Sequence, residues 1–148
     1  MPKKVLIAED DPSDAFLLRR AFAAAGVPAT LHFVRDGQEA IDYLGGEAAY
    51  ADRNAHPLPD LMLLDTRMPG LAGWKILKWV RERPGLRHLP VIVFTGSGDP
   101  GDKKMAEALD AAYEIKPQSF NELVQVVRKM GGFWLHEVPA RRNAGQRQ

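Results

Sequence analysis

Residues 61–70 read LMLLDTRMPG, four apolar residues that end in an aspartate, Asp65. A short apolar run bounded by turn residues is typical of a buried strand in a parallel sheet. Asp65 would then lie at the carboxyl end of that strand, and the TRMPG loop would leave its carboxylate exposed at the strand tip. Open parallel sheets bind their ligands at this edge, so one segment predicts both a strand and a site.

Three other apolar runs also end on polar residues. They are 5–8 before Glu9 and Asp10, 91–94 before Thr95, and 112–115 before Lys116. Taken singly, Asp10 could cap a helix, Thr95 could cap a turn, and Lys116 could be a solvated side chain. If these residues all lie at the carboxyl ends of parallel strands, they meet at one edge of the sheet. This convergence favours a shared site.

Segments of helical period separate the apolar runs and complete five strand–helix units. Strands are predicted at 5–8, 30–34, 61–64, 91–94 and 112–115, and helices at 12–25, 37–44, 74–83, 101–109 and 120–130. Such alternation predicts a doubly wound, five-stranded parallel α/β sheet with helices on both faces. Gly131 and Gly132 are expected to end the last helix.

Four of these helices begin after a residue that can cap them: Asp11, Asp36, Asp99 and Ser119. Proline follows Asp11 and Asp99, where its missing amide costs nothing. Asp14 occupies the third position of the first helix. These signals support the predicted helix starts.

Length and composition indicate one domain. The chain has 148 residues, of which 45% are hydrophobic, enough for a buried core with little room for a second one. We expect the domain to span residues 3–138 and the polar end of the chain, 139–148, to be a disordered tail. Residues 45–59 are rich in glycine, alanine and proline and predict a long loop, a length typical of a specialised segment.

Charge and cysteine content exclude several classes of function. Lys and Arg number 20 against 19 Asp and Glu, and this balance gives no electrostatic reason to expect nucleic acid or an anionic membrane as a partner. The absence of cysteine excludes disulfides, thiolate catalysis and thiolate metal sites. No apolar run approaches the length of a transmembrane helix, and we expect a cytoplasmic protein.

The carboxylates at the strand ends predict a cation site. Glu9, Asp10 and Asp65 would repel one another unless a cation or protons neutralise them. Mg²⁺ takes oxygen ligands from one or two carboxylates, and a backbone carbonyl just after Asp65 could supplement them. An ionised carboxylate such as Asp65 can attack phosphorus and form an acyl phosphate if the phosphoryl charge is neutralised. Lys116 offers a positive charge and Thr95 a hydroxyl for that purpose.

Four motifs give the chain a family resemblance. VLIAEDDPSD, LMLLDTRMPGLAGW, PVIVFTGS and IKP match in order and spacing the receiver domains of two-component response regulators, over residues 3–130. The resemblance implies a flavodoxin-like fold and a set of roles: phosphoacceptor for Asp65, Mg²⁺ ligands for Glu9 and Asp10, switch hydroxyl for Thr95, and phosphoryl partner for Lys116. It also implies a cis peptide bond before Pro117. The implied protein is a phosphoacceptor rather than an enzyme, with self-phosphorylation from small donors and self-dephosphorylation.

The loop at 45–59 and the ending GGFWLHEVP look like the stand-alone regulators partnered with bacterial phytochrome-type histidine kinases. Such regulators have no output domain. The resemblance implies a sensor histidine kinase as partner and a homodimer. Phe133, Trp134 and Leu135 would either fold back on their own domain or form a patch for self-association.

Four further residues bear on how the site would work. Arg67 would offer its backbone carbonyl to Mg²⁺ and extend its side chain over the site. Arg67 and Ser97 would flank the phosphoryl group, and we hypothesise that they set the access of the hydrolytic water. Tyr113 would rotate inward behind Thr95 on phosphorylation, or is ordinary sheet packing. Glu114 stands where the family usually has an apolar residue.

Two rival functions use the same residues. An aspartyl-phosphate phosphatase needs the same carboxylate, metal, hydroxyl and lysine, but such hydrolases usually carry a second acid where this chain has Arg67, and an added cap domain. A phosphorylation-independent adaptor or dimerisation module could keep the fold. Four intact residues argue against it, Asp10, Asp65, Thr95 and Lys116, while Arg67 leaves it open. The G-x-G-x-x-G pattern at 96–101 is typical of dinucleotide sites only at the first strand of a unit, which this is not.

Overall fold

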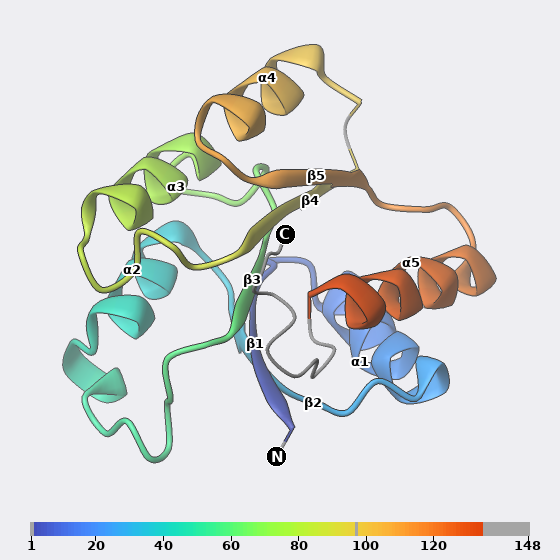
Figure 1. Ribbon diagram of the computed structural model, residues 1–148, viewed down its shortest axis with the longest axis horizontal. Helices are drawn as coiled ribbons and strands as arrows, with labels where there is room; N and C mark the ends of the chain where they lie inside the picture. The colour runs from blue at the N-terminus through green and yellow to red at the C-terminus, as the bar shows by residue number, and fades with distance from the viewer. Residues whose placement is uncertain (1, 97, 135–148) are drawn as a thin grey trace, which may run out of the picture.

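Five parallel strands form one sheet in the order β2-β1-β3-β4-β5 (Figure 1). The strands are β1 (Lys3–Ala8), β2 (Ala29–Val34), β3 (Leu61–Leu64), β4 (Val91–Thr95) and β5 (Ala112–Ile115). The computed structural model describes residues 2–96 and 98–134, so Ser97, Leu135 and the expected tail at 139–148 lie outside the described residues. The predicted doubly wound sheet is confirmed.

Helices cover both faces of the sheet. They are α1 (Pro12–Ala25), α2 (Gly37–Gly45), α3 (Gly73–Glu82), α4 (Pro100–Ala108) and α5 (Phe120–Phe133), with a short 3-10 helix at Ala48–Tyr50. α1 and α5 lie side by side on one face, and α2, α3 and α4 cover the other (Figure 1). The strand order reverses at β1, so the carboxyl ends of β1 and β3 border the point at which such sheets bind ligands.

Alternate residues of the central strands pack into two separate cores, because successive side chains of a strand point to opposite faces. Leu6 and Met62 pack with side chains of α2, α3 and α4. Ile7 and Leu63 pack with side chains of α1 and α5. Burial of both faces explains why these strands have continuous apolar sequences.

The predicted helix caps are present, whereas the predicted end of the last helix is wrong. Oxygens of four side chains accept hydrogen bonds from amides of the first helical turn: Asp11, Asp36, Asp99 and Ser119. Gly131 and Gly132 do not end α5, which continues to Phe133. A glycine within a helix costs only about 1 kcal/mol, and a Cβ at Gly131 would lie 2.8 Å from Val27 Cγ2. Gly131 therefore allows the close approach of α5 to Val27.

The segment at 45–59 is anchored to α2 rather than extended. Arg53 Nη1 and Nη2 donate to the carbonyls of Tyr43 and Leu44, both at 2.7 Å. The Tyr50 hydroxyl donates to Glu39 Oε2 at 2.5 Å. The two Arg53 bonds thus reach carbonyls in the last turn of α2, where a helix lacks its own i+4 donors.

Glu114, the unexpected charge in β5, has an ionic partner. Its Oε2 lies 2.9 Å from Lys129 Nζ on α5, and its side chain is 26% exposed.

Among the described residues, no helix is both long enough and apolar enough to cross a bilayer.

Candidate functional site

The Lys116 ammonium joins carboxylates from three separate segments. Its Nζ lies 2.9 Å from Asp65 Oδ2 and 3.0 Å from Asp14 Oδ2, and it also donates to Glu9 Oε1. Lys116 follows β5, Asp65 follows β3, Glu9 follows β1, and Asp14 belongs to α1. The structure therefore brings the predicted strand-end residues together.

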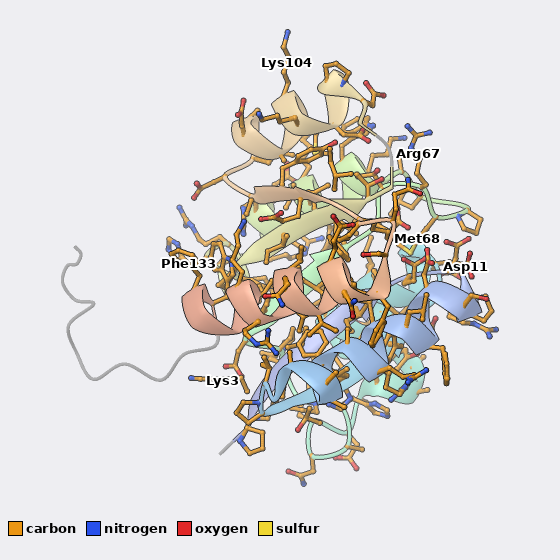
Figure 2. All side chains as sticks on the ribbon, turned by 90° about the vertical axis from the view of Figure 1, so that its right-hand side faces the viewer. Lys3, Asp11, Arg67, Met68, Lys104 and Phe133 are labelled. Carbon is orange, nitrogen blue, oxygen red and sulfur yellow. The ribbon has the colours of Figure 1, made fainter. Side chains whose placement is uncertain are left out.

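Strand register places Glu9 and Asp65 next to each other. Ala8 of β1 pairs with Leu64 of β3, and the amide of Asp65 donates to the carbonyl of Ala8 at 3.1 Å. In Figure 2 this edge of the sheet lies toward the end of the molecule where Asp11 is labelled, opposite Lys3 at the start of β1. Both carboxylates are buried, with Glu9 3% and Asp65 6% exposed.

Asp65 is less exposed than the sequence suggested, because both of its oxygens are covered. Oδ2 accepts a hydrogen bond from Lys116, and Oδ1 accepts one from the amide of Arg67 at 2.9 Å. A donor on each oxygen fixes the orientation of the carboxylate. Figure 2 shows Arg67 at the same end of the molecule as Asp11.

Burial and hydrogen bonding shift the pKa values of Glu9 and Lys116 in opposite directions. Burial raises the pKa of Glu9 to about 7, although hydrogen bonds from Lys116 and the amide of Asp11 favour its ionised form. Burial alone would lower the pKa of Lys116, but its hydrogen bonds to Glu9 and Asp65 outweigh burial and raise that pKa. Lys116 is therefore a permanent cation at neutral pH.

The acidic side chains fit a divalent cation. One oxygen from each of Glu9, Asp10 and Asp65 can be chosen so that all three lie within 4.8 Å of one another. Asp10 is less buried than the other two, so a cation would bind at the rim of the sheet edge. A donor set made only of oxygen suits a hard cation.

The residues expected to surround a phosphoryl group lie on the β4 side of the site. Thr95 is fully buried at the end of β4. The Arg67 side chain reaches toward the start of α4, where its Nη2 lies 3.9 Å from Asp99 Oδ2. Tyr113 is partly buried in β5, and its pKa is raised by burial and then by the charges of Asp102 and Asp99.

Three further residues lie at the site without having been predicted there: Asp14, Thr66 and Asp102. Asp14 was identified only as part of a helix start, but its carboxylate contacts Lys116. Thr66 Oγ1 lies 3.1 Å from Asp102 Oδ2 and 3.4 Å from Thr95 Oγ1. The position of Asp14, five residues after Glu9 and one helical turn into α1, was the available signal; Thr66 gave none.

The expected cis peptide bond before Pro117 is not observed. All peptide bonds of the described residues are trans. A trans bond before proline is favoured by about 0.5–1 kcal/mol, so it is the default geometry unless the surroundings select the other.

Residues 5–128 match the family model of the response regulator receiver domain. The chain belongs to this family. The aspartate, lysine and acidic cluster described above therefore occur in a receiver domain, as the motifs predicted.

Curated relatives of this receiver domain align along nearly its whole length. The probable methanogenesis regulatory protein FilR2 of Methanothrix harundinacea is 33% identical over 135 residues, which cover 90% of this chain and 84% of FilR2. The response regulator Rcp1 of Synechocystis is 29% identical over 138 residues, covering 93% of this chain and 92% of Rcp1.

Solved structures support the same assignment. The phosphorylated cyanobacterial phytochrome response regulator RcpA superposes with a TM-score of 0.84 at 33% identity, over 94% of this chain and 99% of RcpA. The Mn²⁺-bound form of Rcp1 superposes with a TM-score of 0.81 at 29% identity, over 93% of this chain and 97% of Rcp1. The receiver fold predicted from the sequence is confirmed.

Proposed function

We propose that this receiver accepts a phosphoryl group on Asp65 from a phosphohistidine of a sensor histidine kinase. The observation that carries the proposal is the double fixation of Asp65 by Lys116 and the amide of Arg67, both at 2.9 Å. A carboxylate held in this way can present one oxygen to phosphorus while the cation of Lys116 stays beside the reacting atoms.

The reaction needs no general base, because a carboxylate nucleophile has no proton that must be removed. A bond forms between a carboxylate oxygen of Asp65 and phosphorus, and the bond from phosphorus to the imidazole nitrogen breaks with its electron pair left on the imidazole. Lys116 neutralises part of the phosphoryl charge, and Thr95 donates a hydrogen bond to it. Attack of water on phosphorus later releases inorganic phosphate and restores the carboxylate, so the protein acts as a phosphoacceptor that resets itself.

Mg²⁺ is the cation that we assign to the acidic cluster. Glu9, Asp10 and Asp65 would hold it, with the backbone carbonyl of Arg67 as a further oxygen ligand. When bound, Mg²⁺ would neutralise charge on the phosphoryl oxygens. The Mn²⁺-bound structure of Rcp1 supports a divalent cation in a related protein.

Signalling would begin when the phosphoryl group on Asp65 competes with the present partners of the Thr95 hydroxyl. A phosphoryl group on Asp65 would attract this hydroxyl and favour a second arrangement of the loop after β4. Tyr113, on the neighbouring strand, would then move inward. The side chains of Arg67 and Ser97 would set the access of water and hence the lifetime of the acyl phosphate.

We assign a phytochrome-type kinase as the partner because RcpA is a phytochrome response regulator. Exposure of two aromatic side chains supports a homodimer, since Phe133 is 76% and Trp134 40% exposed at the end of α5. Leu135, the third residue of the expected patch, lies outside the described residues. Exposed aromatic residues of this kind are enriched in protein interfaces.

Intact-protein mass spectrometry after incubation with acetyl phosphate and Mg²⁺ tests the proposal. We expect one phosphoryl addition, lost in Asp65→Asn and on chelation of the metal. Asp60→Asn is the matched control, because Asp60 precedes the same strand at its opposite end. No addition to the parent protein, with beryllofluoride also failing to bind, would instead favour a phosphorylation-independent adaptor.

A further inference from the structure

Asp14 has the position of a helix-capping acid but not the contacts of one. It is the third residue of α1, where an acidic side chain usually reaches back to the amide of the N-cap residue. That amide, of Asp11, is already bound by Glu9 Oε2 at 3.0 Å. The Asp11 side chain in turn accepts from the amides of Ser13 and Asp14. The Asp14 carboxylate is therefore not needed for the cap.

The Asp14 carboxylate contacts the site lysine instead. Its Oδ2 accepts a hydrogen bond from Lys116 Nζ at 3.0 Å. An ammonium has three donors, and Lys116 directs them to the three carboxylates of Glu9, Asp65 and Asp14. Asp14 is the most exposed of these partners, with 39% of its side chain accessible, so it holds the ammonium from the solvent side.

Two of the three carboxylates that contact Lys116 could also bind a cation, and the third could not. Glu9 and Asp65 belong to the acidic cluster that fits a cation, whereas Asp14 does not. A cation bound to that cluster would compete with Lys116 for the oxygens of Glu9 and Asp65. Asp14 would then remain hydrogen-bonded to Lys116 both with and without a cation in the cluster.

Among the described residues, the lysine stem has no other fixed acceptor on its inner side. Lys116 borders a small cavity of about 50 Å³ that is lined by Asp14 and otherwise by apolar and proline side chains: Leu17, Leu18, Phe94, Pro117 and Leu123. A lysine side chain has considerable rotamer freedom when nothing holds it. The location of the ammonium therefore depends on its carboxylate partners.

We propose that Asp14 is a positioning residue for Lys116, which holds the ammonium beside Asp65 while the cluster carries its cation. The inference rests on the proposed phosphoacceptor function. It assigns Asp14 to the preorganisation of the site and not to the binding of the metal or to the helix cap.

The rate of phosphorylation at saturating Mg²⁺ tests this assignment. Asp14→Ala should react about fivefold more slowly with acetyl phosphate, which corresponds to the loss of one charge-assisted hydrogen bond at a half-exposed position. The dissociation constant of Mg²⁺, measured by calorimetry without phosphodonor, should change by less than about threefold, because exposed charges outside the ligand set are screened. Asp14→Asn keeps the side-chain volume and should fall between the parent and Asp14→Ala.

Glu122→Ala is the matched control for loss of a first-turn acid. Glu122 is the third residue of α5 and contacts Ser119 rather than the site. It should leave both the phosphorylation rate and the Mg²⁺ affinity unchanged. An equal slowing in this control would overturn the assignment, because the effect would then be one of helix stability.

A double-mutant cycle with Lys116→Ala separates positioning from a direct effect of charge. If Asp14 acts through Lys116, removing it in the Lys116→Ala background should change the residual rate by less than about twofold. The same slowing in both backgrounds, or none in the single variant, would overturn the proposal. A parent protein that takes up no phosphoryl group would instead be a failure of the proposed function itself.

Discussion

Thr66 Oγ1 lies 3.1 Å from Asp102 Oδ2. Thr66 follows Asp65 directly and Asp102 belongs to the first turn of α4, so this contact connects the site to that helix. A hydroxyl has one proton and an ionised carboxylate has none, so Thr66 donates to Asp102. Thr66 Oγ1 also lies 3.4 Å from Thr95 Oγ1, so the two hydroxyls are in contact. A phosphoryl group on Asp65 that attracted the Thr95 hydroxyl would draw it away from Thr66, so this contact opposes switching.

Thr66→Val should therefore loosen the first turn of α4 without phosphorylation. Loss of one hydrogen bond of about 1 kcal/mol predicts about fivefold faster amide exchange at 101–105. Asp102→Ala should act in the same direction. Hydrogen exchange measured by mass spectrometry is the readout, with Thr30→Val, an exposed residue of β2, as the matched control. Unchanged exchange in both site variants would contradict the prediction.

Gly73 is required for the approach of α3 to the loop that follows Asp65. A Cβ at Gly73 would lie 2.8 Å from Thr66 Cα, a backbone atom that cannot move without its neighbour Asp65. Gly73→Ala should destabilise the protein by about 1–3 kcal/mol through overpacking and slow its phosphorylation.

Gly132→Ala is the control for this substitution, because nothing lies within 4 Å of a Cβ there and the residue is helical. It should stabilise α5 by about 0.5–1 kcal/mol. Urea unfolding at pH 7 measures both effects. Equal changes of the same sign would show that the contact with Thr66 does not constrain Gly73.

The fold was predictable because its signals are local. Continuous apolar runs mark the central strands, capping residues mark the starts of four helices, and the parallel topology brings Asp65 and Lys116 to one edge. The end of α5 was not predictable, because the contact of Gly131 with Val27 joins segments far apart in sequence.

The site residues that directly follow strands were predictable, because the strand ends determine their positions. The site residues whose place depends on the direction of the side chain were not predictable. Glu9, Asp65 and Lys116 follow strands, so the backbone alone places them. Asp14 is on a helix, and its carboxylate contacts Lys116 while Glu9 binds the Asp11 amide that a first-turn acid usually caps. Thr66 gave no signal, since its partner lies 36 residues further along the chain.

Tyr50 couples the stability of the α2–β3 segment to pH. Burial, followed by the hydrogen bond and charge of Glu39, raises the pKa of Tyr50 from 10.0 to about 12. The folded protein therefore retains a proton that the unfolded chain loses, so this contribution is complete below about pH 10 and is lost as the pH rises toward 12.

Tyr50→Phe should cost about 1 kcal/mol at pH 8, and the difference from the parent should shrink between pH 10 and 12. Urea unfolding at pH 8, 10 and 11 measures this. Tyr43 and Tyr113 are present in both proteins, so the difference isolates Tyr50. Parallel stability curves for the two proteins would contradict the assigned role of the hydrogen bond with Glu39.

Phe133 offers the most direct test of the proposed homodimer. Its side chain is 76% exposed at the end of α5, so it does not fold back on its own domain. Phe133→Ser should raise the dimer dissociation constant by about tenfold or more, the effect of losing an aromatic interface residue. Phosphorylation should be unaffected, because Phe133 lies far from the site edge (Figure 2). Phe16→Ser, which replaces an aromatic residue 58% exposed on α1, is the matched control. Analytical ultracentrifugation of the three proteins measures the outcome, and equal dissociation constants for Phe133→Ser and the parent would place the self-association surface elsewhere.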